Sequence, residues 1–167
     1  VTSFGTRNTR TVRDALGGAR LYRNDGARFV DVTAAAGILS PENAFGLGVV
    51  AADVDRDGWP DLYVAHDYYE RDYLYVNRRD GTFREAHEQA FPVGSYFSMG
   101  LDVADVDDDG WPDVYTTDML PDDERRLRTA TAFEGWDVYQ AKVRMGYGHQ
   151  LMRNMLQRNN GDGTFAD

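Results

Sequence analysis

The chain has 167 residues, with 28 Asp and Glu against 18 Lys and Arg, a formal net charge of −10 and no cysteine. This length suits a single domain with its own core, and an aromatic content of 13% argues against disorder, because disordered segments are poor in aromatic residues. The acidic balance argues against a nucleic-acid partner, no apolar run in the sequence approaches the length of a membrane span, and the lack of cysteine excludes disulfides and thiolate zinc sites.

Short strands separated by turns make up most of the predicted structure. In chain order, runs rich in β-branched and aromatic residues predict strands at 28–33, 48–52, 62–65, 73–76 and 82–85. The Asp80-Gly81 pair predicts a tight turn before the last of these strands, because glycine accepts a positive φ at little cost. A later segment has a proline, then acidic and then basic residues, which is typical of a helix start. We expect one or two helices between residue 118 and about residue 155, which either cover an edge of the strands or form a partner-binding surface.

Two acidic blocks repeat 52 residues apart. Residues 53–61 read DVDRDGWPD and residues 105–113 read DVDDDGWPD, so the blocks differ only at the fourth position, Arg56 against Asp108. A second motif, a leucine followed three residues later by an asparagine and then a glycine turn, begins at residues 21, 74 and 156. Self-similarity at a period near 50 residues, with about four short strands per repeat, is the layout of β-propeller blades.

The sequence therefore predicts an all-β fold built from β-propeller blades of about four antiparallel strands, with a short helical insertion. The predicted repeat segments are about 1–44, 45–97 and 98–167, and the predicted insertion is about 118–150. A closed propeller needs about 4–8 blades, which is more than this length supplies. We expect a fragment of a larger propeller, a portion of a larger assembly, or an open stack of blades closed by a partner.

The acidic blocks carry the predicted chemistry. Aspartates at positions 1, 3, 5 and 9 bring four carboxylates around one point once the chain curls, which the glycine at position 6 permits. Converging carboxylates repel one another unless a cation lies between them. Oxygen ligands in a flexible loop favour Ca²⁺, and position 7 adds a main-chain carbonyl. The predicted ligands of two Ca²⁺ sites are Asp53, Asp55, Asp57, Trp59 (main chain) and Asp61, and Asp105, Asp107, Asp109, Trp111 (main chain) and Asp113.

Other interpretations of the acidic blocks fit less well. An EF-hand needs a glutamate at position 12, where the chain has Val64 and Thr116, and the strand-like flanks disfavour both an EF-hand and a dockerin-type site. A haloacid-dehalogenase-like nucleophile would be needed once, whereas the block is duplicated. A solvated acidic turn without an ion is disfavoured because Gly, Trp, Pro and Asp repeat in register. Asp108, the odd residue of its block, is expected to point outward.

These motifs resemble a known family. The Asp-x-Asp-x-Asp-Gly-x-x-Asp-Leu loop between strands is similar to the FG-GAP/VCBS repeat, the calcium-bearing blade of integrin-α-type propellers, and residues 45–48 resemble its Phe-Gly element. The Leu-Tyr-x-Asn and Asp-Gly-Thr-Phe stretches, with residues 31–38, resemble bacterial CRTAC1-like proteins, which carry VCBS repeats and often an ASPIC/UnbV domain. Asp118 to Pro121 and residues 152–157 are also similar to those proteins. No ASPIC/UnbV domain is visible in this sequence.

The resemblance implies an exported or cell-surface protein whose Ca²⁺-stiffened propeller is a binding scaffold. Loops of this kind suit the micromolar-to-millimolar Ca²⁺ found outside the cytoplasm. We expect an extracytoplasmic module (periplasmic, cell-surface or secreted) that contacts other blades of the same or a neighbouring chain and a protein or carbohydrate ligand. The alternative is an accessory structural subunit of a larger complex, docked through the insertion.

We expect no enzyme, although a propeller-based lyase or hydrolase is the remaining possibility. His66, His87 and His149 are interpreted as surface residues without catalytic roles, and the sequence has no Gly-x-Ser-x-Gly elbow or phosphate-binding loop. A set of aromatic residues either forms a carbohydrate or protein contact surface or fills the space between blades. Its members are Tyr68, Tyr69, Tyr73, Tyr96 and Phe97.

Overall fold

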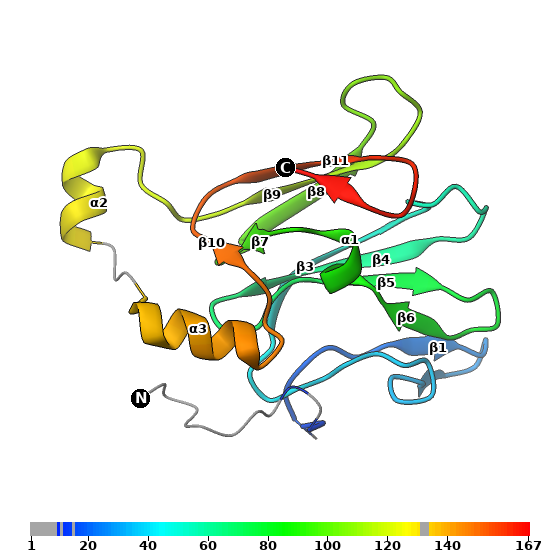
Figure 1. The fold of residues 1–167 in the computed structure, drawn as a ribbon. Helices are drawn as coiled ribbons and strands as arrows, with labels where there is room; N and C mark the ends of the chain where they lie inside the picture. The colour runs from blue at the N-terminus through cyan, green and yellow to red at the C-terminus, as the bar shows by residue number, and fades with distance from the viewer. Residues whose placement is uncertain (1–9, 11, 15, 131–133) are drawn as a thin grey trace.

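The computed structural model describes residues 10, 12–14, 16–130 and 134–167, and short antiparallel strands dominate its fold (Figure 1). A two-stranded hairpin pairs β1 (Tyr22–Asn24) with β2 (Phe29–Asp31). The first four-stranded sheet contains, in spatial order, β3 (Phe45–Ala52), β4 (Asp61–Asp67), β5 (Tyr73–Asn77) and β6 (Phe83–Glu85). The second contains β8 (Gly100–Ala104), β9 (Asp113–Thr117), β11 (Met155–Asn159) and β12 (Phe165–Ala166).

The two sheets have the same connectivity. In each, neighbouring strands are antiparallel and follow one another along the chain, apart from the insertion between β9 and β11. An acidic block joins the first two strands and a glycine-containing turn joins the last two. This confirms the predicted all-β class, with blades of four antiparallel strands and a short helical insertion. The first nine residues of the predicted segment 1–44 lie outside the described part of the chain.

The core lies between the sheets because each strand places apolar side chains on a face that its neighbour covers. One buried cluster joins the two blades and includes Tyr63, Leu74, Val114 and Phe165. The first strands of the two blades approach closely: a Cβ added at Gly48 of β3 would lie 2.7 Å from the Leu101 side chain of β8. A second cluster packs the segment that follows the β1–β2 hairpin against the first sheet; it contains Ala36, Ile38, Val64, Tyr73 and Tyr75.

The insertion between β9 and β11 holds α2 (Glu124–Ala130), α3 (Trp136–Arg144) and β10 (Gln150–Leu151). Figure 1 shows α2 standing away from the sheets, whereas α3 lies nearer to them. β10 pairs in parallel with β7 (Gly94–Ser95), a pairing that the sequence did not predict. Residues 131–133 of the predicted insertion lie outside the described residues. No helix in the described part of the chain has the length and apolar character needed to cross a membrane.

Two of the three histidines contradict the prediction that they lie at the surface. His66 is buried inside β4, where its ring lies edge-on to Tyr73 at 4.7 Å between centroids. His87 is buried in the single-turn helix α1 (His87–Ala90) and packs on Phe91. The prediction failed because a polar flanking sequence says nothing about which segments later cover a residue.

The predicted aromatic set divides between interior and surface. Tyr69 and Tyr73 are buried, whereas Tyr68 is partly exposed and stacks on Phe97 at 6.1 Å between centroids. Tyr96 contacts Phe97 edge-on at 4.4 Å. These contacts favour packing between segments over a single exposed contact surface.

Candidate metal sites

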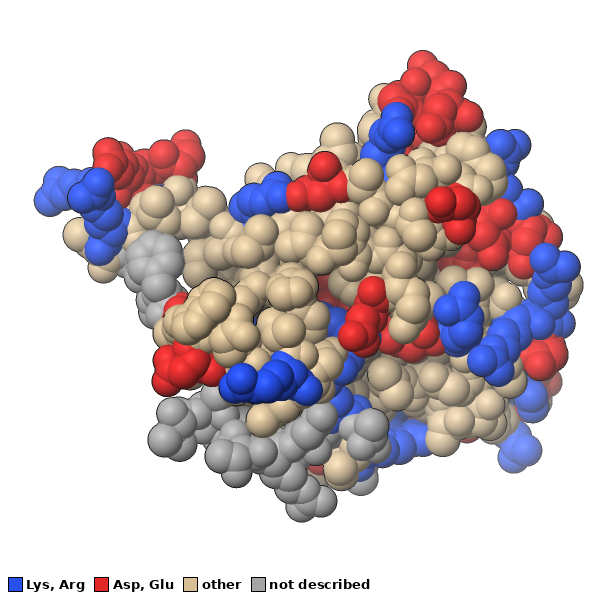
Figure 2. All heavy atoms as spheres, in the orientation of Figure 1, with Lys and Arg blue, Asp and Glu red and all other residues tan. Residues whose placement is uncertain are grey.

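The two acidic blocks form the β3–β4 and β8–β9 connections, and both lie on the same side of the molecule. Figure 1 shows them at the right, together with the β5–β6 and β11–β12 turns, and Figure 2 shows Asp and Glu side chains gathered over that side. Strand pairing brackets each loop, with Ala52 opposite Asp61 and Ala104 opposite Asp113. The sheets therefore hold both ends of each loop at a fixed separation.

The two loops curl with the same internal hydrogen bonds. In the first, the Asp53 carboxylate accepts hydrogen bonds from the backbone N–H groups of Asp57 at 2.9 Å and Gly58 at 2.8 Å. In the second, Asp105 accepts the corresponding pair at 3.1 and 2.8 Å. Gly58 and the matching Gly110 have φ of 88° and 90°, in the left-handed region that favours glycine. The curl turns the aspartate side chains inward, which a straight strand would not do.

Three carboxylates converge in each loop. One oxygen of each lies within 4.8 Å of one oxygen of the other two, in Asp53, Asp55 and Asp61 of the first loop and in Asp105, Asp107 and Asp109 of the second. Two oxygens bound to one Ca²⁺ at 2.3–2.6 Å are at most about 5.2 Å apart, so this spacing fits one ion in each loop. Clusters made only of carboxylate oxygens suit a hard cation.

The structure places Asp57 and Asp113 outside these two clusters. Asp57 accepts the backbone N–H of Trp59 at 2.8 Å and forms an ion pair with Arg79 at 2.8 Å. Asp113 accepts the backbone N–H of Val106 at 3.0 Å, as Asp61 does from the corresponding residue of the first loop. Of the eight aspartates predicted as ligands, the structure thus brings six into clusters, three in each loop.

Asn77 and Asn159 support the loops, and the sequence analysis missed both. The buried carboxylates of Asp61 and Asp113 each accept the backbone N–H of one of these asparagines at 2.8 Å. Each asparagine also donates from Nδ2 to the carbonyl of its loop's proline, at 2.9 and 3.0 Å. A signal was present, because both asparagines close the repeated motif that begins at residues 74 and 156.

Two aspartates of the first loop have raised pKa values. Burial raises the pKa of Asp55, and the nearby carboxylate of Asp57 raises it further. Burial also raises the pKa of Asp61, although the backbone N–H groups of Asn77 and Val54 oppose the shift. Carboxylates that resist ionisation in this way gain stability when a cation occupies the space between them.

The two tryptophans that were predicted to contribute main-chain carbonyls have different surroundings. Trp59 is exposed. The Arg56 guanidinium lies over the Trp111 ring, 5.2 Å from its centroid, and a Cβ at Gly161 would lie 2.8 Å from the ring. Asp108, which occupies the same position in the second loop as Arg56 in the first, is exposed as expected. The fourth residue of the first loop, Arg56, thus contacts the second loop, and its counterpart in the second loop, Asp108, is exposed.

A comparison with protein families agrees with the internal repeat. The model of the FG-GAP-like repeat matches residues 11–64 and 53–116, and the second match contains both acidic loops. No curated protein matches the chain. Because the two matches together span residues 11–116, more than half of the sequence, the chain belongs to the family of FG-GAP-like repeat proteins.

Proposed function

We propose that both acidic loops bind Ca²⁺ and that the chain is a calcium-stabilised β-propeller module for protein or glycan interaction outside the cytoplasm. The observation that carries this proposal is the pair of three-carboxylate clusters, formed by loops with the same internal hydrogen bonds. A single acidic turn is common without an ion. Two such loops at equivalent places in two blades are better explained by a shared ligand.

In this proposal the three clustered aspartates of each loop supply the ion's first oxygen ligands. Asp57, Asp113 and the main-chain carbonyls of Trp59 and Trp111 are the predicted remaining ligands. Bound Ca²⁺ neutralises the repulsion within the loop and ties together two strands of one blade, because the ligands flank the β3–β4 or β8–β9 turn. The ion therefore stiffens the blade edge, and the family's repeat fold supplies the interaction surface.

A second candidate is an accessory subunit of a larger complex. Its support is the insertion, because α2 projects from the body of the molecule and its Glu124 and Arg128 are exposed (Figure 1). An enzymatic role has less support. Burial lowers the pKa of His66 to about 4, which keeps its ring neutral and enclosed at pH 7. The finer likeness to CRTAC1-like proteins stays a prediction.

Thermal unfolding with and without metal tests the calcium proposal. A ligand at about 100 times its Kd adds about 2.7 kcal/mol per site, which corresponds to a rise of roughly 5–10 °C in Tm per site for a chain of this size. We expect EDTA to lower Tm and added Ca²⁺ to restore it. Isothermal titration should count two sites, and Asp53→Asn or Asp105→Asn should each remove one. Equal melting curves in EDTA and Ca²⁺ would overturn the proposal.

A further inference from the structure

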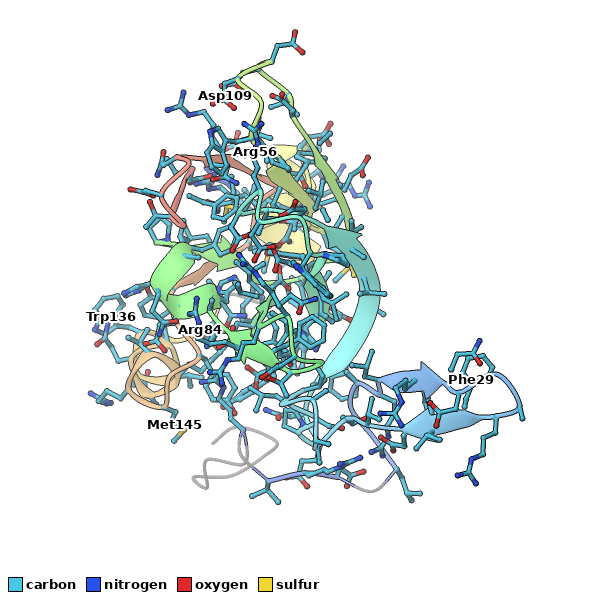
Figure 3. All side chains as sticks on the ribbon, turned by 90° about the vertical axis from the view of Figure 1, so that its right-hand side faces the viewer. Phe29, Arg56, Arg84, Asp109, Trp136 and Met145 are labelled. Carbon is cyan, nitrogen blue, oxygen red and sulfur yellow. The ribbon has the colours of Figure 1, made fainter. Side chains whose placement is uncertain are left out.

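A groove in the insertion lies apart from the acidic loops. It has a volume of about 540 Å³, within the range of small-molecule sites, and residues of α3 and β10 together with Tyr96 line it. Figure 3 shows Trp136 at the left edge of the molecule, far from Asp109 of the second acidic loop. A ligand bound in this groove would therefore be separate from any ion in the loops.

The wall of the groove on α3 is an aromatic pair. Trp136 is 73% exposed, and its ring stacks on Tyr139 with centroids 5.5 Å apart and planes 26° from parallel. Tyr139 is fixed in turn by a 2.6 Å hydrogen bond between its hydroxyl and Nδ1 of His149. A flat aromatic surface is thus held in one orientation and left open to solvent.

Two polar side chains that line the groove, Gln150 and Glu134, offer hydrogen-bond acceptors. Gln150 is only 7% exposed; its Nε2 donates to the carbonyl of Glu70 at 3.4 Å, and its Oε1 has no hydrogen-bond partner among the described residues. A buried amide oxygen without a donor is costly, so a donor from a ligand would be favoured there. The carboxylate of Glu134 adds a second acceptor that lines the same groove.

A buried lysine of α3, Lys142, packs against Tyr96, which lines the groove. Nζ of Lys142 lies 4.1 Å from the ring centroid of Tyr96 and 5.0 Å from that of Tyr69, and 3.5 Å from the Glu134 carboxylate. These contacts tie α3 to the propeller body, so the groove is pre-formed, which reduces the entropy lost on binding. Lys142 compensates Glu134 from inside, and no Lys or Arg is among the described residues that line the groove.

We propose that this groove binds a neutral oligosaccharide, a conclusion that rests on the interaction role proposed above and specifies its ligand. A sugar ring offers a C–H face to the negative face of the Trp136 ring. Its hydroxyl groups can donate to Oε1 of Gln150, which has no donor among the described residues, and to the Glu134 carboxylate, which has room for donors besides Tyr96 and Lys142. The described residues that line the groove include acceptors but no Lys or Arg, which disfavours sulfated, phosphorylated or uronic sugars. An apolar or proline-rich peptide would use the aromatic face but leave the acceptors unmatched.

Titration of the full chain with cellotetraose, mannotetraose and chitotetraose, in the presence of Ca²⁺, tests the proposal. We expect at least one of them to bind and to change tryptophan fluorescence. Trp136→Ala should weaken binding by about tenfold or more, and Glu134→Gln should weaken it less. Phe29→Ala is the matched control, because Phe29 is also a strongly exposed aromatic residue but lies on the β1–β2 hairpin (Figure 3).

Three outcomes would overturn the glycan assignment. The first is that none of the three sugars binds at about 10 mM, a concentration at which even millimolar affinity is detected. The second is an equal loss of sugar affinity in the Trp136→Ala and Phe29→Ala variants. The third is that a proline-rich peptide binds more tightly than the sugars and that its binding depends on Trp136. The melting curves keep the two proposals distinguishable. If Ca²⁺ raises Tm and no sugar binds, only the glycan assignment fails; if a sugar binds and Ca²⁺ has no effect, only the calcium proposal fails.

Discussion

The two acidic loops have nearly the same sequence and the same internal hydrogen bonds, yet their surroundings differ. Val54 of the first loop is 6% exposed and belongs to the core between the blades, whereas Val106, at the same position in the second loop, is 55% exposed. The first loop lies against the second blade. Among the described residues, no further blade lies against the second loop. The curl of a loop is thus encoded locally by the repeat, whereas its burial depends on the blade that follows.

Replacing the two valines gives the largest expected contrast. Val54→Ala should lower the free energy of unfolding by about 2 kcal/mol, because it removes buried methyl groups and leaves a cavity between blades. Val106→Ala should change it by less than about 0.5 kcal/mol, because the side chain is exposed. Urea unfolding in EDTA measures both without the contribution of metal. Equal losses would mean that a contact absent from the structure covers the second loop.

Titration with acid sharpens the comparison for the first loop. Because burial raises the folded-state pKa of Asp61, metal-free protein gains stability from this group at low pH. That contribution is fully present below the ordinary pKa of 3.8 and is lost as pH rises through the folded-state pKa. The binding of a single proton changes the free energy of unfolding by at most about 1.4 kcal/mol per pH unit. With Ca²⁺ the sign reverses, because metal binds only the ionised carboxylate.

Urea unfolding of wild type and Asp61→Asn, at steps from about pH 4 to 7, checks this prediction. The difference in free energy between the two proteins should change with pH in opposite directions in EDTA and in Ca²⁺. Taking the difference between the two proteins cancels the pH-dependent contributions of the aspartates elsewhere in the chain. The same direction in both buffers would show that Asp61 does not take part in metal binding.

The two supporting asparagines differ by one bond between blades. Nδ2 of Asn159 donates to the carbonyl of Val54 at 2.9 Å in addition to its own loop, whereas Nδ2 of Asn77 donates within its own blade. A buried hydrogen bond contributes about 1 kcal/mol, so Asn159→Ala should destabilise by about that much more than Asn77→Ala. Thermal unfolding of the two variants in parallel measures the difference. A larger loss of stability for Asn77→Ala than for Asn159→Ala would contradict the stabilising role assigned to the bond between Asn159 and Val54.

Much of this arrangement could be predicted from the sequence, because the information is local. The six clustered aspartates lie within two nine-residue blocks, and the glycine at position 6 of each block indicates where the chain curls. The blades of four short strands followed from the period of the repeat. Contacts between blades were not predictable in the same way. The roles of Asn159 and Arg56 depend on which blade lies alongside, and the burial of His66 depends on segments far away in the sequence.

The smallest expected effect concerns the only position at which the blocks differ. Arg56 and Asp108 both have a positive φ, 57° and 59°, so the two alanine variants place alanine in the same left-handed backbone conformation. Arg56→Ala removes the cation–π contact with Trp111 and should cost about 0.5–1 kcal/mol. Asp108→Ala should be nearly neutral. Unfolding in EDTA, followed by tryptophan fluorescence, measures both, and Arg56→Lys should retain part of the contact. If the two alanine variants unfold alike, the fourth position does not link the blades, and its variation between the repeats has no structural consequence in this pair.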